Sequence, residues 1–263
     1  MNSIRSYSYT DAAKFAFNTL KHHYKTFLKL IILYIPMLQY VFYMSLPIIR
    51  LAELSPNAFA NNPVLVCFLI IIASLCMLLA AFLFSYWYVW SAKICYLLYD
   101  NNIDSILAVR PAKRAYFHQL KTSFVVFFMT VVGFILLIIP GFIILFRYGF
   151  APIRSLESFS SVKDTLKFSR KITAGNIWFI ISQLGTGMLC IWLFLFTIAF
   201  LQVLLIKAVV SVSNISVLLW ANYILSVLGW AVSWFFGVLV WVYVYRRLKD
   251  NYERTVEQEN FRG

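Results

Sequence analysis

The chain has few charged side chains, and the acidic ones are the scarcest. Its 263 residues include 10 Asp and Glu against 23 Lys and Arg, and charged residues make up 13%, where soluble domains carry about 25%. There are only three histidines. Metal-assisted hydrolysis needs clustered carboxylates and histidines, and the sequence contains no such ligand motif. We therefore expect no metal site.

Short motifs of catalysis are missing as well. The sequence contains no P-loop, no GxSxG and no HExxH. Its four cysteines have no CxxC spacing and no adjoining histidine cluster, so we interpret them as small buried hydrophobic residues rather than as disulfides or zinc ligands. We expect a non-enzymatic protein without a cofactor. An active site assembled from residues far apart in the sequence is the remaining alternative.

Hydrophobic residues, by contrast, make up 62% of the chain. A transmembrane helix needs about 20 mainly apolar residues, and four stretches are long enough, namely residues 27–49, 64–90, 178–206 and 217–245. We expect no signal peptide, because residues 1–25 are polar and lack an apolar core and a cleavage pattern. The composition predicts an all-α, polytopic integral membrane protein whose helical bundle forms a single membrane domain over residues 1–263.

A fifth apolar region, residues 123–153, is interrupted by Pro140 and Gly141. Proline lacks an amide hydrogen and clashes with the preceding turn, and glycine tolerates a reversal. The two arms, 123–139 and 142–153, would be about 25 Å and about 18 Å long as helices, and neither comfortably spans a hydrocarbon core of about 30 Å. Two interpretations are open: a Pro-Gly hairpin or re-entrant pair that returns to its side of origin, or one kinked span.

The positions of lysine and arginine distinguish these interpretations. With a hairpin, 21 of the 23 lie on one side of the membrane, whereas a kinked span divides them 11 against 12. Because positive charge in short loops stays in the cytoplasm, we favour the hairpin. It predicts about six membrane segments with both termini cytoplasmic, including a tail over residues 246–263. Whether 142–153 crosses the bilayer fully or is re-entrant stays open.

Two amphipathic helices are expected on the same side, over residues 10–25 and 160–174. The second places four cations on one face: Lys163, Lys167, Arg170 and Lys171. We interpret both as interfacial helices, with apolar faces toward acyl chains and cations toward anionic phospholipid headgroups.

Arg147 and Arg154 support a sharper hypothesis. They stand seven residues apart, so they share one face of the second arm, where they could hold a lipid phosphate or an anionic solute. The alternative for Arg147 is that its side chain extends to the cytoplasmic interface.

Small and polar residues inside the predicted spans indicate helix contacts. Gly229, Ser233 and Gly237 recur every four residues, which gives a ridge for close packing either within the chain or between two copies of it. The amides of Gln39, Gln183 and Asn222 are predicted to hydrogen bond between helices.

The order of motifs between residues 136 and 178 resembles one known family. The pattern IIPGF is followed by an arm that ends in GFAPI and by the segment DTLKFSRKITAGNIW, as in the bacterial YciC-type membrane proteins and the membrane region attached to some glycerophosphodiester phosphodiesterases. The matching residues are Pro140, Gly141, Ala151, Pro152, Ser169, Gly175 and Asn176. The resemblance implies a multi-spanning protein of the bacterial inner (cytoplasmic) membrane, and it brings no active site with it.

Three functions are consistent with these features. The first is a non-enzymatic role in envelope or lipid organisation, with anionic phospholipids as partners. The second is a transporter or channel for a small or anionic solute, since broken helices often line substrate sites. The third is a scaffold subunit of a membrane complex, with a homo-oligomer left open. Nucleic acid is not expected as a partner, because the topology already accounts for the basic charge.

Overall fold

The computed structural model describes residues 8–32, 67, 71, 74, 88–99, 113–157, 160–209 and 215–261. Every regular element in these ranges is an α-helix, which confirms the all-α class. Most of the predicted spans 27–49 and 64–90 lies outside the described residues. The chain divides into two compact units, Met1–Phe27 with Val89–Gly263, and Leu28–Tyr88. All the labelled helices below belong to the first unit.

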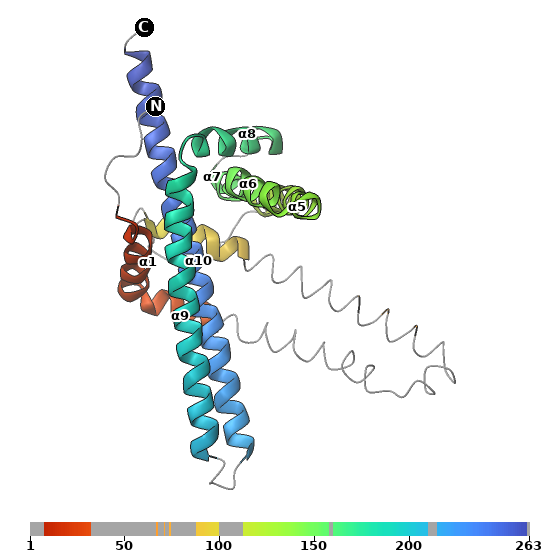
Figure 1. Ribbon diagram of the computed structural model, residues 1–263, viewed down its shortest axis with the longest axis vertical. Helices are drawn as coiled ribbons and strands as arrows, with labels where there is room; N and C mark the ends of the chain where they lie inside the picture. The colour runs from red at the N-terminus through yellow and green to blue at the C-terminus, as the bar shows by residue number, and fades with distance from the viewer. Residues whose placement is uncertain are drawn as a thin grey trace. The chain divides into compact units, whose positions relative to one another are not determined.

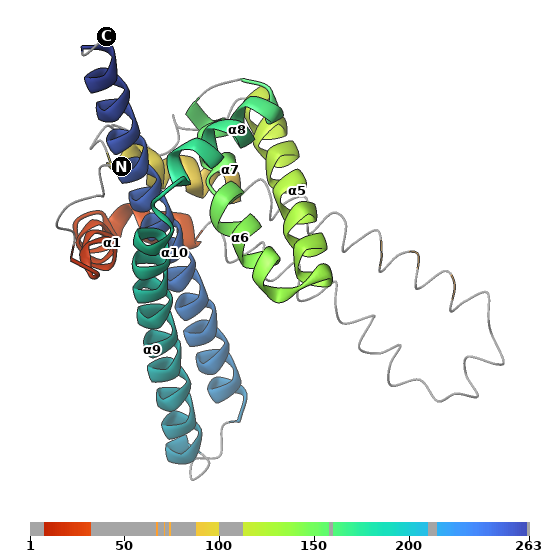
Figure 2. The same ribbon diagram turned by 45° about the horizontal axis from the view of Figure 1, so that its top comes forward.

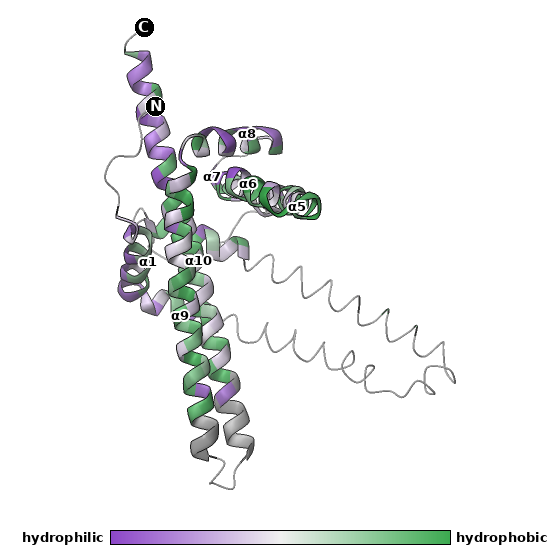
Figure 3. Cartoon of the chain, viewed as in Figure 1, coloured by the Kyte–Doolittle hydropathy of each residue, from purple (hydrophilic) through white to green (hydrophobic). Residues whose placement is uncertain are grey.

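Two long helices, α9 (Ile177–Val209) and α10 (Ile215–Asn260), run side by side in opposite directions (Figure 1). Figure 3 shows hydrophobic residues along most of the pair and hydrophilic ones toward the C-terminal end of α10. The predicted cytoplasmic tail thus continues the last span as one helix. Among the described residues, three helices are long and apolar enough to cross a membrane, at Tyr116–Leu136, Ile177–Leu204 and Ile224–Asn260. The expectation of a membrane protein is supported to this extent.

A second pair, α5 (Lys113–Leu136) and α6 (Ile138–Tyr148), also lies side by side (Figure 2). The helix is interrupted at Leu137, whose backbone is extended with φ −166° and ψ 149°. Pro140 and Gly141 lie in the first turn of α6, where a missing amide hydrogen breaks no helical hydrogen bond. The break therefore precedes the proline by three residues, and the sequence motif does not mark its position.

The second predicted arm, 142–153, is not a single helix. The chain turns at Gly149 and Phe150, and a short helix α7 (Ala151–Glu157) follows. Trp241 of α10 fixes this turn, because its indole N–H donates to the Gly149 carbonyl at 3.2 Å and its ring stacks on Phe150. Pro152 is a local cause of the turn, because it cannot donate to the carbonyl four residues earlier, and the contact with Trp241 then holds the turn in place.

The two predicted amphipathic helices are present as α1 (Asp11–His22) and α8 (Val162–Thr173). Ser161 caps α8 by accepting from the Asp164 amide at 3.2 Å. After α8 the chain reverses through Gly175, whose φ of 78° is the left-handed conformation that glycine tolerates best. The prediction that the less polar face of α8 lies against acyl chains is wrong, because its residues are buried against α5, α6, α7 and α10, namely Thr165, Ser169, Ile172 and Thr173.

Candidate functional site

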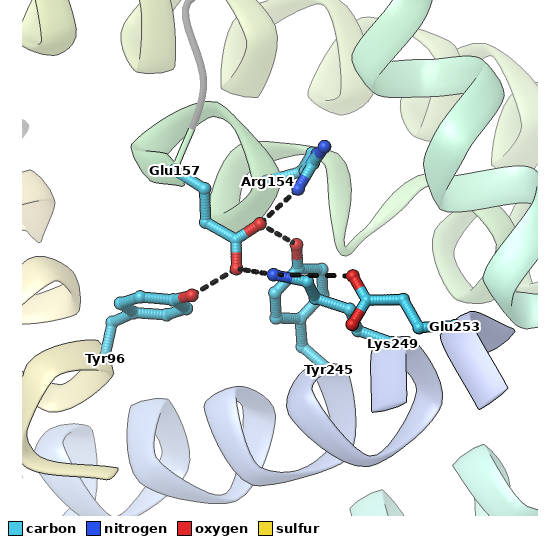
Figure 4. Close-up of polar contacts among 6 residues, drawn as sticks. All are labelled: Tyr96, Arg154, Glu157, Tyr245, Lys249 and Glu253. Atoms are coloured by element: carbon cyan, nitrogen blue, oxygen red, sulfur yellow. Dashed lines mark hydrogen bonds and ion pairs between the residues drawn. The ribbon is translucent and has the colours of Figure 1, made fainter. Parts of the chain in front are cut away.

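A single carboxylate, that of Glu157 at the end of α7, gathers four hydrogen-bond donors (Figure 4). The Tyr245 hydroxyl donates to Oε2 at 2.9 Å, and the Lys249 ammonium donates to Oε1 at 3.0 Å. Tyr96 donates to Oε1, and the Arg154 guanidinium donates to Oε2. We call these five residues the Glu157 cluster.

Three elements bring the Glu157 cluster together. Tyr245 and Lys249 are four residues apart on α10 and therefore share a face. Arg154 precedes Glu157 by one turn of α7, and Tyr96 comes from the helical residues 89–99. The cluster thus ties α7 to two helices that are distant in the sequence.

Electrostatics keep the Glu157 carboxylate ionised. Burial by itself would raise the pKa of Glu157, but hydrogen bonds from Tyr96, Lys249 and Tyr245 outweigh it, so the pKa lies below its ordinary value. Its two oxygens accept four bonds, which uses the acceptor capacity of a carboxylate. These bonds hold α7 against α10 and against the helical residues 89–99, and we call the Glu157 cluster the latch.

Rings and cations extend the latch to α8. The Arg154 guanidinium lies 4.3 Å from the centroid of Phe168 on α8, and Arg246 lies 3.8 Å from that of Tyr96. The next residue of α8, Ser169, donates to the Arg147 carbonyl at the end of α6 at 2.8 Å. Helix α8 is consequently held in a fixed orientation by α6 and α7.

This orientation exposes the cations of α8. Lys163, Lys167, Arg170 and Lys171 are all exposed, and we call them the α8 basic face. The one acidic residue of α8, Asp164, accepts from the Ser161 hydroxyl at 2.6 Å. Within the described part of the chain, none of the four cations forms an ion pair. The face is therefore free to meet an anion.

The hypothesis that Arg147 and Arg154 share one helix face fails. Arg147 is exposed at the end of α6, whereas Arg154 is on α7, beyond the turn at Gly149 and Phe150. Arg154 also already has an anionic partner in Glu157. A phosphate clamp made of these two arginines on one arm has no geometric basis here.

The residues that carry the family resemblance have structural roles at the helix junctions. Ala151 and Pro152 begin α7 and are buried, and Asn176 donates to the Ile172 carbonyl at 3.4 Å at the start of α9. With Ser169 and Gly175, they fix the course of the chain from α6 to α9.

The small-residue ridge of α10 faces α9. A side chain added at Gly229 would lie 2.5 Å from Ile198 Cδ1, and one added at Gly237 would lie 3.5 Å from Ile191 Cδ1. Ser233 stands between them and is buried. These contacts place the ridge in the α9–α10 interface within one chain.

Two buried glutamines have opposite surroundings. Gln183 of α9 is bonded at both ends to the start of α1, because it accepts from the Ala12 amide at 3.0 Å and donates to the Ser8 carbonyl at 2.9 Å. Gln119 of α5 is fully buried, and neither its oxygen nor its nitrogen has a partner among the residues that the structure describes.

The predicted hydrogen bond between helices is confirmed at Gln183. It is not found at Asn222, whose Oδ1 has no partner among the described residues, and Gln39 lies outside them. Sequence reasoning missed Gln119 and the Glu157 cluster. Gln119 could have been found from the sequence, because the polar residues at positions 119, 122, 123 and 130 share one helix face. The four-residue spacing of Tyr245 and Lys249 was a weak indication of the Glu157 cluster. No local pattern points to Tyr96.

A metal centre is not formed by the described residues, which include no group of three or more His, Cys, Asp or Glu side chains close enough to hold an ion. Comparisons of the chain with family models, with curated proteins and with solved structures find no match.

Proposed function

We propose that the chain is a non-enzymatic membrane protein that binds anionic phospholipid headgroups through the α8 basic face and serves envelope or lipid organisation. The observation that carries the proposal is the pairing of four exposed cations on one side of α8 with a buried opposite side. Helix α8 is held by the latch and by Ser169, so the cations are presented without a further ordering cost. Each near-surface cation adds about 1 kcal/mol of affinity for an anionic leaflet.

The membrane topology belongs to the same proposal. The turn between α5 and α6 is apolar and exposed, with Ile135, Leu137 and Ile139 all at least 68% accessible. Such a turn is unfavourable in water and favourable among acyl chains. Helix α6 has 11 residues and is about 16 Å long, too short for a core of about 30 Å. We place α5 and α6 as a re-entrant pair, in a six-segment protein of the bacterial inner membrane with both termini cytoplasmic.

Membership of the YciC-type group stays a prediction from the motifs quoted above. The scaffold alternative rested on two features, and one of them is weakened, because the ridge of Gly229, Ser233 and Gly237 packs against α9. Its other feature, the basic charge predicted on the cytoplasmic side, remains. The transporter alternative is favoured by one observation, the buried polar face of α5.

Lipid binding is tested on the purified protein in nanodiscs by native mass spectrometry that resolves bound lipids. Wild-type protein is expected to retain phosphatidylglycerol or cardiolipin over phosphatidylcholine. The variant K163Q/K167Q/R170Q/K171Q should lose this preference by up to about two to three orders of magnitude in affinity, at about 1 kcal/mol per cation.

The matched control is K163R/K167R/R170K/K171R, which keeps every charge and should keep the preference. Equal retention of anionic and zwitterionic lipid by the wild type would overturn the proposal. So would an unchanged preference in the glutamine variant.

A further inference from the structure

Helix α5 carries its polar residues on the buried side and its apolar residues on the exposed side. Phe124, Phe127, Val132 and Ile135 are all at least 50% accessible, whereas Gln119 is completely buried. Residues 116–136 of α5 form one of the candidate membrane spans. Polar residues within a span face the bundle interior or a water-filled space, and they often mark the path of a substrate.

Several polar atoms on this buried side have no partner among the described residues. They are both side-chain polar atoms of Gln119, Oγ of Ser123, Oγ1 of Thr130 and Nε2 of His118. Thr122 is different, because its hydroxyl donates to the His118 carbonyl of its own helix at 2.9 Å. We call Gln119, Ser123 and Thr130 the α5 polar seam.

Gln119 differs from the two hydroxyl residues of the seam in how its polar atoms can be satisfied. A serine or threonine can turn its hydroxyl to the carbonyl four residues earlier, as Thr122 does. Ser123 and Thr130 can therefore hydrogen bond within their own helix. Gln119 has two polar atoms to satisfy, and at the other buried glutamine, Gln183, the protein satisfies both. A buried amide without partners is strongly unfavourable, and polar interior sites are normally occupied by ordered water.

The geometry and charge of the seam indicate which ligand it takes. Gln119, Ser123, Val126 and Thr130 lie on one helix face, and the distance from residue 119 to residue 130 is about 16 Å along the axis, about half of a hydrocarbon core. The same face ends at Gly133, where α6 closes on it; an added Cβ there would lie 2.9 Å from Gly141 Cα. The seam residues are all uncharged, so they suit a neutral ligand with both donor and acceptor groups.

We propose that the α5 polar seam is a hydrated site within the membrane domain, in which Gln119, Ser123 and Thr130 bind a row of water molecules or a small neutral solute with hydroxyl groups. The three seam side chains are uncharged, so they favour a neutral ligand over an ion. This proposal does not depend on lipid binding by the α8 basic face. It gives the transporter alternative a solute class, which is small, neutral and hydrogen-bonding.

X-ray hydroxyl-radical footprinting of the protein in nanodiscs tests the proposal, since radicals form on water next to a side chain and label it. Val126 lies between Ser123 and Thr130 and is 6% accessible, and Val227 on α10 is a matched reporter at 7%. The expected result is that Val126 is labelled at least fivefold faster than Val227. The variant Q119M/S123A/T130V should bring its rate down to that of Val227.

Two controls keep the test decisive. Thr122→Val removes a hydroxyl that is already satisfied, and it should leave the labelling of Val126 unchanged. Should the triple variant fail to fold, Ser123→Ala alone should halve the rate. Equal labelling of Val126 and Val227 in the wild type would overturn the proposal. A rise in Tm of more than about 4 °C for Gln119→Met would also overturn it, because it would show that the amide had been dry and unpaired.

Discussion

The α9–α10 pair and the α5–α6 pair both pack closely at a glycine, but their helices differ in length. In both, a glycine of one helix lets the partner approach, with Gly187 against Val240 in the first pair and Gly133 against Gly141 in the second. The first pair is 33 and 46 residues long, and the second is 24 and 11. Both helices of the first pair and α5 of the second are therefore long enough to cross a bilayer, whereas α6 is too short.

Each pair also buries one glutamine, and the two glutamines differ in how their amides are satisfied. In the first pair, α10 supplies Tyr245 and Lys249 to the Glu157 cluster, and α9 holds Gln183, whose amide is bonded at both ends. The second pair buries Gln119 with no partner among the described residues. We infer that α9 and α10 form the rigid frame of the first unit. We also infer that the amide of Gln119 on α5 is available to hydrogen bond with a ligand.

The largest change in stability is expected from a substitution in the Glu157 cluster. Glu157→Gln leaves Arg154 and Lys249 without their counter-charge, and both side chains are mostly buried, at 26% and 17% accessible. Removing one partner of a buried pair costs about 3 kcal/mol. The free energy of unfolding in detergent, measured at pH 7, should fall by about this amount. Glu253→Gln is the control, because Glu253 is 55% accessible and 3.9 Å from Lys249, and it should change little.

The same variant has a defined pH dependence. The pKa of Glu157 is lowered in the folded protein, so its ionised form adds stability above the unfolded value of about 4.3 and loses that contribution as pH falls through the folded value. The gap in stability between wild type and Glu157→Gln should therefore be constant from pH 8 to pH 6 and shrink below about pH 4. A gap that grows on acidification would contradict an ionised Glu157.

The next effect tests the shared glycine contact. An added methyl at Gly141 would meet the Phe134 ring at 2.4 Å, so Gly141→Ala should destabilise by about 1–3 kcal/mol. Gly185 of α9 has nothing within 4 Å of an added methyl, and Gly185→Ala should be neutral or stabilising by about 0.5–1 kcal/mol. Thermal unfolding of the two variants side by side measures the difference. Equal behaviour would show that α5 and α6 do not touch at this point.

A smaller effect distinguishes the two glutamines. Gln183→Leu removes two hydrogen bonds to the start of α1 and should cost about 1–2 kcal/mol, with faster hydrogen exchange at the Ala12 amide. Gln119→Met removes no bond to a described residue and should change stability by less than about 0.5 kcal/mol if water satisfies the amide. Hydrogen exchange by mass spectrometry checks the first result and thermal unfolding the second. Unchanged exchange in Gln183→Leu would contradict the clamp on α1.

Sequence reasoning was informative where periodicity or length carries the signal. The helical class, the apolar length of α9 and α10, and the cationic face of α8 all follow from patterns within a few turns. It failed where the cause lies elsewhere in the chain. The turn at Gly149 is contacted by Trp241, about ninety residues later, and the Glu157 cluster includes Tyr96, about sixty residues before Glu157.

The α8 helix shows the same limit within one element. Its amphipathic pattern predicted two faces correctly, but a pattern cannot tell whether the less polar face meets lipid or protein. Burial of Ser169 and Thr173 decides for protein. The composition of that face, with two threonines and one serine among its four buried residues, suits hydrogen bonding to neighbouring backbone better than contact with acyl chains.

A further small effect is expected at the proline near the break between α5 and α6. Pro140 lies in the first turn of α6, and the extended residue is Leu137, so the interruption does not depend on the missing amide hydrogen. Pro140→Ala should change stability by less than about 1 kcal/mol. It should also leave Ser161, which is exposed, on its original side of the membrane. Labelling of Ser161→Cys by a membrane-impermeant maleimide, with and without Pro140→Ala, measures this. If the proline did cause the break, its removal would join α5 and α6 into one span, and Ser161 would change sides.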